Sequence, residues 1–238
     1  MRHRFFNLYV DDFDLDHLSK IQSGFHIANL NLDQVILAQK DTKFLKIINS
    51  ADLIIPDGEI IPLTFNLFLK SRFKQRLKKC AGIDLAYQLI QKSKRLALIG
   101  STQEVIDKLK IRFSSNLVFA QDGFFHLNQK DEIIEQLVLA KPDLLLVAMG
   151  APRQEKLIAE LVSFLPDTIK MGVGGAFDVW AGKSKRAPRW MIFLSLEWLF
   201  RIIQEPSRLK VFSFNMCNYA LLLFSNYFGE IISSKSEK

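Results

Sequence analysis

The chain has 238 residues, 49% of them hydrophobic, which is enough to bury the core of one large domain with a small appendage. Its formal net charge of +7 favours an anionic partner such as a phosphate, a nucleic acid or a lipid headgroup. The two cysteines have neither disulfide nor zinc-site spacing, and the first residues lack the apolar core of a signal peptide, so composition argues against a disulfide-rich secreted domain. We expect a cytoplasmic protein.

The first distinctive segment is acidic. Residues 11–16, DDFDLD, contain two overlapping Asp-x-Asp patterns, which in some enzymes hold a divalent metal ion against a pyrophosphate. Asp14 or Asp16 also stands where a helix would begin, and an aspartate there caps the free backbone N–H groups. We interpret the segment as a helix start and predict no metal site. The four histidines are too dispersed in the sequence to form a zinc motif.

The middle of the chain alternates between apolar runs and amphipathic patterns. The apolar runs predict buried strands at residues 25–29, 51–57, 95–101, 143–150 and 168–175. Helical patterns lie between them, at residues 32–40, 83–93, 102–113 and 130–141. Strands that are apolar on both faces and alternate with helices predict an α/β fold, with a mainly parallel Rossmann-like sheet and helices on both faces.

Glycines follow several predicted strands: Gly58, Gly100, Gly150 and the pair Gly174-Gly175. In open α/β sheets ligands bind beyond the carboxyl ends of the strands, so we expect the site at this edge. The GVGG loop (172–175) can turn its backbone N–H groups toward a nucleotide pyrophosphate, although a tight strand-to-helix turn explains it equally well. The nicotinamide fingerprint GxGxxG is incomplete and the P-loop pattern GxxxxGK[ST] is missing from the sequence, which argues against those two classes.

Asp57 lies in IIPDGE, at the end of a very apolar strand. Burial there would raise the pKa of its carboxyl and suit a general base, while Pro-Asp-Gly is also a common turn sequence. Gln154 and Glu155 open the helix that follows Gly150, where they either contact a ligand or favour the helix dipole. The residue types make Asp57 a candidate catalytic residue and leave both turn and helix-start readings open.

Cations gather at residues 70–79, with six cations and no anion, and at residues 183–210, with a net charge of +5. Residues 211–228 then carry no charge, and thirteen of the eighteen are apolar. On a helix their polar members would form one stripe: Asn215, Asn218, Ser225 and Asn226. A basic stretch followed by such a helix favours a helix lying among lipid headgroups. The alternatives are a helix docked on the core or on another subunit, and a membrane span.

The two basic segments also fit a nucleic-acid-binding protein that stacks bases on some of the 20 phenylalanines. Most of these phenylalanines lie inside apolar helices and strands, where we expect them to be buried in the core. We therefore predict no nucleic acid among the partners.

Four segments together resemble the WecG/TagA/CpsF family of bacterial glycosyltransferases: ADLIIPDGEIIP, GIDL, LLLVAMGAPRQEKLI and GVGGAFDVWAGKSKRAPRWMIFLSLEWLFRIIQEPSRL. Their order and spacing match over roughly residues 5–210. The resemblance implies an inverting transferase that moves a sugar, often N-acetylmannosamine, from a UDP-sugar to a polyprenyl-diphosphate-linked acceptor. It also implies work at the inner face of the cell membrane, in cell-surface polysaccharide or teichoic acid synthesis.

The resemblance assigns roles position by position, and the general base falls on Asp57. The donor-binding positions are Asn29, Asn31, Gly100, Gly150, Gln154, Glu155, Gly174, Gly175 and Asp178. The positions expected to meet the acceptor diphosphate are Lys79, Arg201, Arg208 and Lys210. No cofactor is implied beyond the UDP-sugar substrate. We favour a transferase that needs no metal, in which backbone amides and basic side chains stabilise the leaving diphosphate.

Three positions depart from the family pattern: Asn29 replaces a threonine, and Lys79 and Val211 each replace an arginine. A lysine offers a point charge where an arginine offers a planar fork, so these differences bear on the donor sugar and leave the reaction class unchanged. We divide the chain into a catalytic domain (1–190) and a helical, membrane-facing appendage (191–238), and a homo-oligomer is a further expectation. The alternatives to an enzyme are a basic nucleic-acid-binding α/β protein and a non-catalytic regulator that binds a sugar nucleotide.

Overall fold

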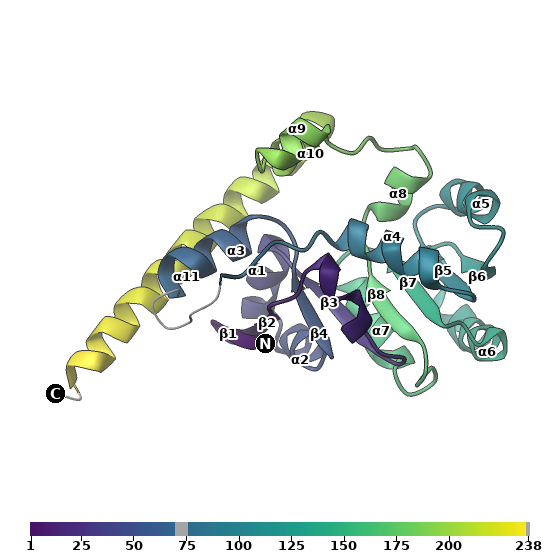
Figure 1. Ribbon diagram of the computed structural model, residues 1–238, viewed down its shortest axis with the longest axis horizontal. Coiled ribbons are helices and arrows are strands. Elements are labelled where there is room, and N and C mark those ends of the chain that lie inside the picture. The colour runs from purple at the N-terminus through teal and green to yellow at the C-terminus, as the bar shows by residue number, and fades with distance from the viewer. Residues whose placement is uncertain (70–75, 237–238) are drawn as a thin grey trace.

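A six-stranded parallel sheet forms the centre of the protein in the computed structural model, which describes residues 1–69 and 76–236 (Figure 1). Its strand order is β4-β3-β8-β7-β5-β6. The strands are β3 (His26–Leu30), β4 (Leu53–Pro56), β5 (Leu96–Gly100), β6 (Leu117–Gln121), β7 (Leu144–Ala148) and β8 (Ile169–Gly172). Every pair of neighbours in this sheet is parallel, so all the carboxyl ends lie at one edge.

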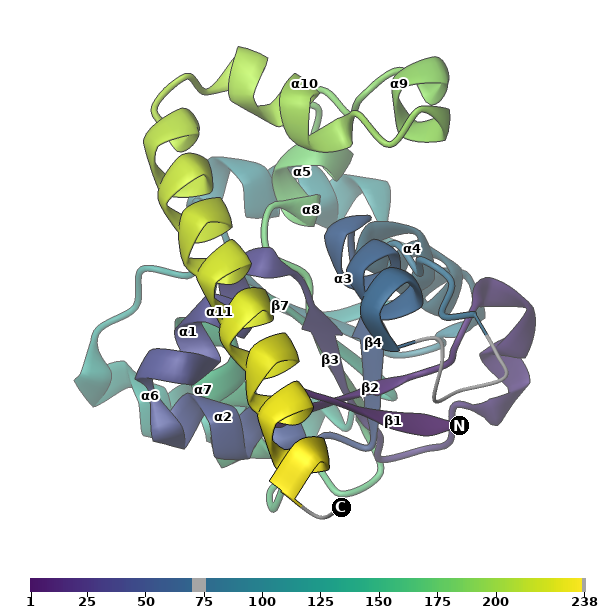
Figure 2. The same ribbon diagram turned by 90° about the vertical axis from the view of Figure 1, so that its left-hand side faces the viewer.

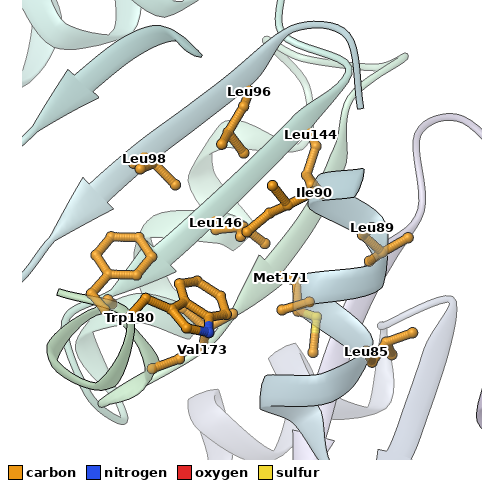
Figure 3. Packing of buried hydrophobic residues seen from close by; sticks show 14 of the residues in the cluster. Leu85, Leu89, Ile90, Leu96, Leu98, Leu144, Leu146, Met171, Val173 and Trp180 are labelled. Carbon is orange, nitrogen blue, oxygen red and sulfur yellow. The ribbon is translucent and has the colours of Figure 1, made fainter. Parts of the chain in front are cut away.

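Helices cover both faces of the sheet. One face carries α4 (Gly82–Lys92), α5 (Gln103–Arg112) and α8 (Ala176–Trp180). The other carries α1 (Leu32–Lys40), α2 (Thr42–Asn49), α6 (Lys130–Ala140) and α7 (Arg153–Leu161). Figure 3 shows the first layer, in which leucines and an isoleucine of α4 pack against side chains of β5, β7 and β8. The predicted α/β fold, with a parallel sheet between two helical layers, is therefore confirmed, including its five strands and four helices.

The structure adds elements that the sequence analysis did not predict. An antiparallel hairpin of β1 (Arg2–Phe5) and β2 (Leu8–Asp11) lies at the start of the chain, and β6 forms one edge of the main sheet. The unpredicted short helical turns are α3 (Ile60–Thr64), η2 (Phe65–Leu69) and η4 (Leu127–Gln129). A further short turn, η1 (Leu15–Lys20), follows the helix start predicted at residues 11–16. In β1 exposed and buried residues alternate, and Tyr9 is the one exposed residue of β2. The strand β6 is a short apolar run, LVFAQ, whose residues are all half-buried.

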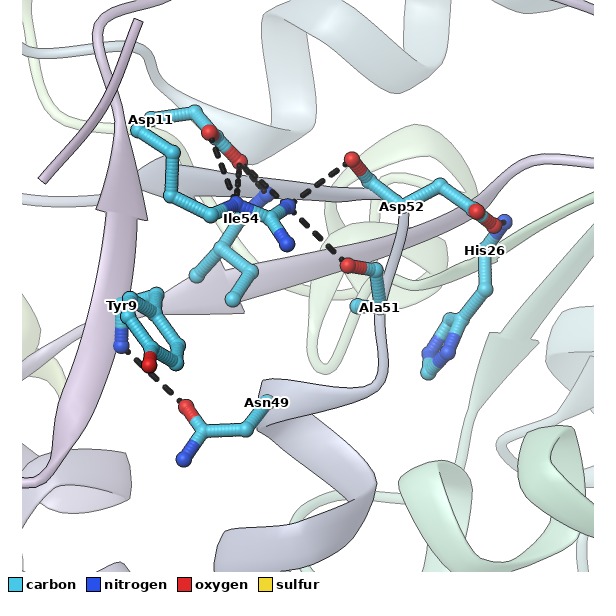
Figure 4. A network of polar contacts seen from close by, with 8 residues as sticks. Tyr9, Asp11, His26, Asn49, Ala51, Asp52 and Ile54 are labelled. Carbon is cyan, nitrogen blue, oxygen red and sulfur yellow. Dashed lines mark hydrogen bonds and ion pairs between the residues drawn. The ribbon is translucent and has the colours of Figure 1, made fainter.

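The hairpin is fixed to the amino end of β4 by Arg2 and Asp11 (Figure 4). Arg2 Nε and Nη2 donate to the Asp11 carboxylate over 3.0 and 2.8 Å, and Nη2 also donates to the Asp52 carbonyl over 2.8 Å. The same carboxylate accepts the backbone N–H of Ile54 over 2.8 Å. Asp11, the first residue of the acidic segment, therefore serves the hairpin.

The helix start predicted at the acidic segment is present as the 3-10 helix η1, and Asp14 occupies its N-cap position. The predicted capping contact is wrong, because the Asp14 side chain makes no hydrogen bond to the helix N–H groups. Its carboxylate instead contacts Lys78 Nζ at 3.2 Å and His17 Nδ1 at 2.6 Å. These contacts lower the pKa of Asp14 against the opposing effect of desolvation.

We call the helices from Arg189 onward the C-terminal appendage, which begins two residues before the predicted boundary at 191. It consists of α9 (Arg189–Phe193), α10 (Glu197–Gln204) and the long helix α11 (Arg208–Ser236), which lies across α1 (Figure 2). One face of α11 packs on the core formed by the hairpin, α1 and α2, through residues Phe212, Met216, Tyr219, Leu222 and Leu223. Tyr219 is 1% exposed, and its hydroxyl lies 2.6 Å from Thr64 Oγ1. One face of α11 is therefore docked on the core, as one of the alternatives for residues 211–228 proposed.

The polar stripe predicted on α11 is used within the protein. Asn215 Nδ2 donates to Asp33 of α1 over 2.7 Å, and the side chains of Asn218, Ser225 and Asn226 donate to carbonyls of their own helix. Within residues 1–69 and 76–236, none of the helices combines the length and the hydropathy that a membrane span requires. Most of the first basic segment, residues 70–75, lies outside the described residues.

Candidate active site

Asp57 follows β4 at the carboxyl edge of the sheet. Its backbone N–H donates to the Leu30 carbonyl over 2.9 Å, and its Oδ1 accepts the N–H of Gly82, the first residue of α4, over 3.1 Å. Burial of the carboxyl raises the pKa of Asp57, while the Gly82 hydrogen bond and the cations Arg201 and Lys79 act in the opposite direction. Asp57 is half-buried as a residue, and its carboxylate is held by one hydrogen bond beside positive charge.

The appendage brings charged side chains to Asp57. Lys79 Nζ lies 3.0 Å from Glu59 Oε1 and 3.6 Å from Glu197 Oε2, and Arg201 Nη2 lies 3.5 Å from Glu197 Oε1. Glu197 and Arg201 belong to α10, far from Asp57 in the sequence, yet their charges act on the pKa of its carboxyl. The structure therefore places two predicted acceptor-side cations, Lys79 and Arg201, in one group with Asp57.

The other two predicted acceptor-side cations lie further along. Arg208 begins α11 and pairs with Glu205, and Lys210 is exposed one half-turn on. Among the described residues, no hydrogen bond or ion pair joins either of them to the group around Asp57. Their predicted role stays a prediction.

A buried chain of hydrogen bonds shapes the GVGG loop. Gln154 Oε1 accepts the N–H of Gly174 over 3.1 Å, and Gln154 Nε2 donates to Glu155 Oε1 over 2.8 Å. The same oxygen accepts Gln34 Nε2 over 3.1 Å, and Gln34 shares a reciprocal capping box with Asn31 at the start of α1. Gln34, Gln154 and Glu155 are 3, 4 and 3% exposed. Three predicted donor-binding residues, Asn31, Gln154 and Glu155, are thus joined in one network that links α1, α7 and the loop.

Gln34 is a member that the sequence analysis missed. The Asn-x-x-Gln spacing of a capping box was the available signal, but the buried contact with Glu155 joins residues 121 positions apart. Burial raises the pKa of Glu155, and its two amide donors act in the opposite direction. The carboxyl therefore lies in an environment that penalises its charged form.

Asn29, the last but one residue of β3, lies between two glycines. Its Nδ2 donates to the Gly172 carbonyl over 2.9 Å, and a Cβ at Gly82 would lie 2.7 Å from that same nitrogen. A Cβ at Gly172 would lie 2.6 Å from Gln154 Nε2, so both glycines are required by close packing. Asn29 Oδ1 and Glu155 Oε2 are buried oxygens without a hydrogen-bond partner among the described residues. Buried polar atoms of this kind are suited to a ligand.

Asp178, at the start of α8, faces the end of β5. Ser101 Oγ donates to Asp178 Oδ1 over 2.9 Å, and Ser101 was not predicted because a single serine after a strand carries no motif. Gly100 has φ +135°, and a Cβ there would lie 2.3 Å from the Ala148 carbonyl oxygen. In contrast, nothing lies within 4 Å of the Cβ positions of three other predicted donor residues, Gly150, Gly174 and Gly175. A ligand can approach the backbone there.

The arrangement supports two kinds of chemistry at one edge. A desolvated carboxylate beside cations can take a proton from a hydroxyl group while a nearby anion is bound. Exposed backbone in a glycine loop, at the carboxyl ends of parallel strands, suits a phosphorylated ligand. Within the described part of the chain, no group of three or more metal-ligating side chains is placed to hold a metal ion.

Comparisons with known proteins identify the family of this chain. The family model described as "Glycosyl transferase WecG/TagA/CpsF family" matches residues 4–231. An N-acetylglucosaminyldiphosphoundecaprenol N-acetyl-beta-D-mannosaminyltransferase of Bacillus subtilis (strain 168) is 34% identical over 194 residues, covering 79% of this chain and 74% of that protein. The resemblance drawn from the sequence motifs is confirmed, and the chain belongs to the WecG/TagA/CpsF family of glycosyl transferases.

Proposed function

We propose that this glycosyltransferase moves a hexose from a UDP-sugar to a polyprenyl-diphosphate-linked sugar, with Asp57 as the general base. The name of the Bacillus subtilis relative supplies the first substrates to try, an N-acetylmannosamine donor and an N-acetylglucosamine acceptor on undecaprenyl diphosphate. The observation that carries the proposal is the Asp57 carboxyl, whose pKa burial raises and the cations Arg201 and Lys79 lower, at the strand edge that also carries the glycines.

The transfer step is an inverting displacement. The acceptor hydroxyl oxygen attacks the anomeric carbon, the bond from that carbon to the UDP oxygen breaks, and UDP leaves with the electron pair. Asp57 takes the hydroxyl proton. Burial makes its carboxylate a stronger base, while Gly82, Arg201 and Lys79 favour the ionised form that can accept the proton.

The donor diphosphate binds, in this proposal, at the exposed backbone of Gly150, Gly174 and Gly175. Gln154 orients the N–H of Gly174, and backbone N–H groups at this position can stabilise the charge that develops on the leaving diphosphate. Asp178, which accepts a hydrogen bond from Ser101 after β5, is proposed to contact the nucleoside. Asn29, near the end of β3, is proposed to contact the sugar.

The acceptor diphosphate binds, in this proposal, at Lys79 and Arg201, with Arg208 and Lys210 further along. In the free protein Glu59 and Glu197 neutralise Lys79, and Glu197 contacts Arg201. A diphosphate offers these cations more negative charge than the carboxylates do, so binding would rearrange the ion pairs.

The appendage is proposed to meet the membrane through apolar side chains. Large residues of α9 and α10 are exposed, among them Trp190 (61%), Phe193 (87%) and Ile203 (63%). Phe214 and Leu221 of α11 are also exposed. Aromatic and aliphatic side chains next to cations suit the headgroup region of a bilayer.

A vesicle assay tests the membrane contact. Phe193→Glu places a charge in the proposed contact, and Ile111→Glu is the matched control, because Ile111 of α5 is 80% exposed elsewhere. We expect Phe193→Glu to reduce co-sedimentation with phosphatidylglycerol vesicles and Ile111→Glu to leave it unchanged. Equal binding by both variants would contradict the membrane contact.

A transfer assay tests the function. Thermal shift with UDP-, GDP- and dTDP-sugars identifies the donor, and the best UDP-sugar is then incubated with a short-chain polyprenyl diphosphate that carries N-acetylglucosamine. We expect stabilisation by the UDP-sugar and a disaccharide product. No stabilisation by any UDP-sugar and no product would overturn the proposal.

A further inference from the structure

The segment that joins α8 to α9 is fastened on both sides. The N–H of Lys185 donates to Gln204 Oε1 over 3.1 Å, and Gln204 Nε2 donates back to the Lys185 carbonyl over 2.9 Å. The next residue, Arg186, donates from Nη1 and Nη2 to the two oxygens of Asp84, over 2.6 and 2.7 Å. Gln204 is the last residue of α10, and Asp84 lies in the first turn of α4. Two consecutive residues thus connect α4 to α10.

This connection spans the candidate site. On one side, Gly82 of α4 holds the Asp57 carboxylate, two residues before Asp84. On the other side, α10 carries Glu197 and Arg201. Arg186 itself lies close enough to Asp57 and Glu197 for both to raise its pKa, after the larger effect of its hydrogen bonds to Asp84 and against desolvation.

The position of α10 depends on few contacts. None of its residues is fully buried, so the hydrophobic core does not fix it. Besides its contacts with the neighbouring helices α9 and α11, α10 is linked by the 3.6 Å ion pair of Glu197 with Lys79 and by the stacking of Trp198 on Phe212, with ring centroids 4.9 Å apart. A bidentate arginine–carboxylate pair is more directional than either, because both N–H···O bonds must align.

We propose that Arg186, Asp84 and Gln204 form a clasp that positions α10 beside Asp57 and thereby sets the affinity for the acceptor. They are positioning residues, since the clasp acts through Arg201 and Glu197. The inference rests on the proposed function only in assigning α10 to the acceptor. It predicts that loosening the clasp affects the acceptor and spares the donor, whose glycine loop is held by Gln154.

Arg186→Lys is the sharpest variant, because lysine keeps the charge and loses the planar fork. We expect it to raise KM about 5- to 10-fold for a short-chain polyprenyl diphosphate that carries N-acetylglucosamine, and to change KM for the UDP-sugar less than about twofold. Asp84→Asn should raise the acceptor KM by a similar factor. The double variant should have an acceptor KM no higher than that of the more affected single variant, because both substitutions remove the same Arg186–Asp84 interaction. The matched control is Arg2→Lys, which breaks the bidentate pair with Asp11 at the hairpin and should leave both KM values unchanged.

Amide hydrogen exchange tests the clasp without activity. Arg186→Lys should speed exchange in α10 (197–204) and leave α7 (153–161) unchanged. If the wild-type protein transfers no sugar but exchange in α10 still rises, the proposed function fails and the clasp stands. Unchanged exchange in α10, or equal increases in the donor and acceptor KM values, would overturn the clasp.

Discussion

Replacing Asp57 with asparagine separates catalysis from stability. Asparagine keeps an oxygen for the N–H of Gly82, which donates to Asp57 over 3.1 Å, and it removes the negative charge that burial disfavours. The proton acceptor is lost, because an amide cannot serve as a base at neutral pH. We therefore expect a protein that folds well and does not transfer sugar.

Asp57→Asn should lower the rate of transfer strongly and leave the folding stability unchanged or higher. A general base contributes about 10²- to 10⁴-fold to the rate, which corresponds to about 2.7 to 5.4 kcal/mol of the barrier. The free energy of unfolding should not fall by a comparable amount, because asparagine keeps the hydrogen bond to Gly82. Even complete loss of that bond would cost only about 0.5 to 1.5 kcal/mol. Because the folded-state pKa of Asp57 is raised, the wild-type protein loses stability as pH rises from about 3.8 through that pKa, and the asparagine variant escapes this loss.

The assay combines single-turnover transfer with thermal unfolding at several pH values. Asp107→Asn on the exposed surface of α5 is the matched control for an aspartate-to-asparagine change. We expect UDP-sugar affinity to stay close to wild type, turnover to fall at least a hundredfold, and the melting temperature at neutral pH to hold or rise. Turnover within about threefold of wild type would refute the role of Asp57 as the base.

Three further predictions concern other sites. Glu155→Gln keeps an oxygen acceptor for the amides of Gln34 and Gln154 and removes a buried carboxylate whose pKa is raised. The variant should therefore unfold at a higher urea concentration than the wild type at about pH 8. A lower urea midpoint at that pH would contradict this. Tyr219→Phe removes the 2.6 Å hydrogen bond to Thr64 and should lower the free energy of unfolding by about 1 kcal/mol, which denaturant titration measures; no change would show that the bond contributes nothing. Transfer activity should survive EDTA, and loss of activity that manganese restores would show that the acidic segment at residues 11–16 or another site holds a metal.

The sheet was predictable because burial on both faces leaves a plain mark in a sequence. Runs such as LALIG and LLLVA are buried throughout, and a strand of that kind fits only a covered parallel sheet. The strands of the hairpin at residues 2–11 differ, since three of their eight residues are exposed, and the edge strand β6 is a short run in which all five residues are half-buried. Such strands are defined by their partners and not by their own composition.

Some residues of the candidate site were predictable from the sequence and others were not. Asp57 and the strand-end glycines were predicted because parallel strands bring their carboxyl ends together whatever the loops contain. Glu197, Gln34 and Ser101 were not, because each acquires its role from a contact across the fold, such as the pairing of Lys79 with Glu197. Our preference for a helix among lipid headgroups at residues 211–228 also did not predict that Tyr219 of this segment is buried in the core.

The position of β8 bears on how the chain folds during synthesis. It is the last strand of the sheet in sequence, yet it lies between β3 and β7 and joins the pair β4-β3 to the trio β7-β5-β6. Until Ile169–Gly172 has left the ribosome, these two groups have no common strand, and each exposes an unpaired apolar edge. The late, long-range closure favours slow folding, and a nascent chain interrupted before residue 172 would present two edges open to aggregation.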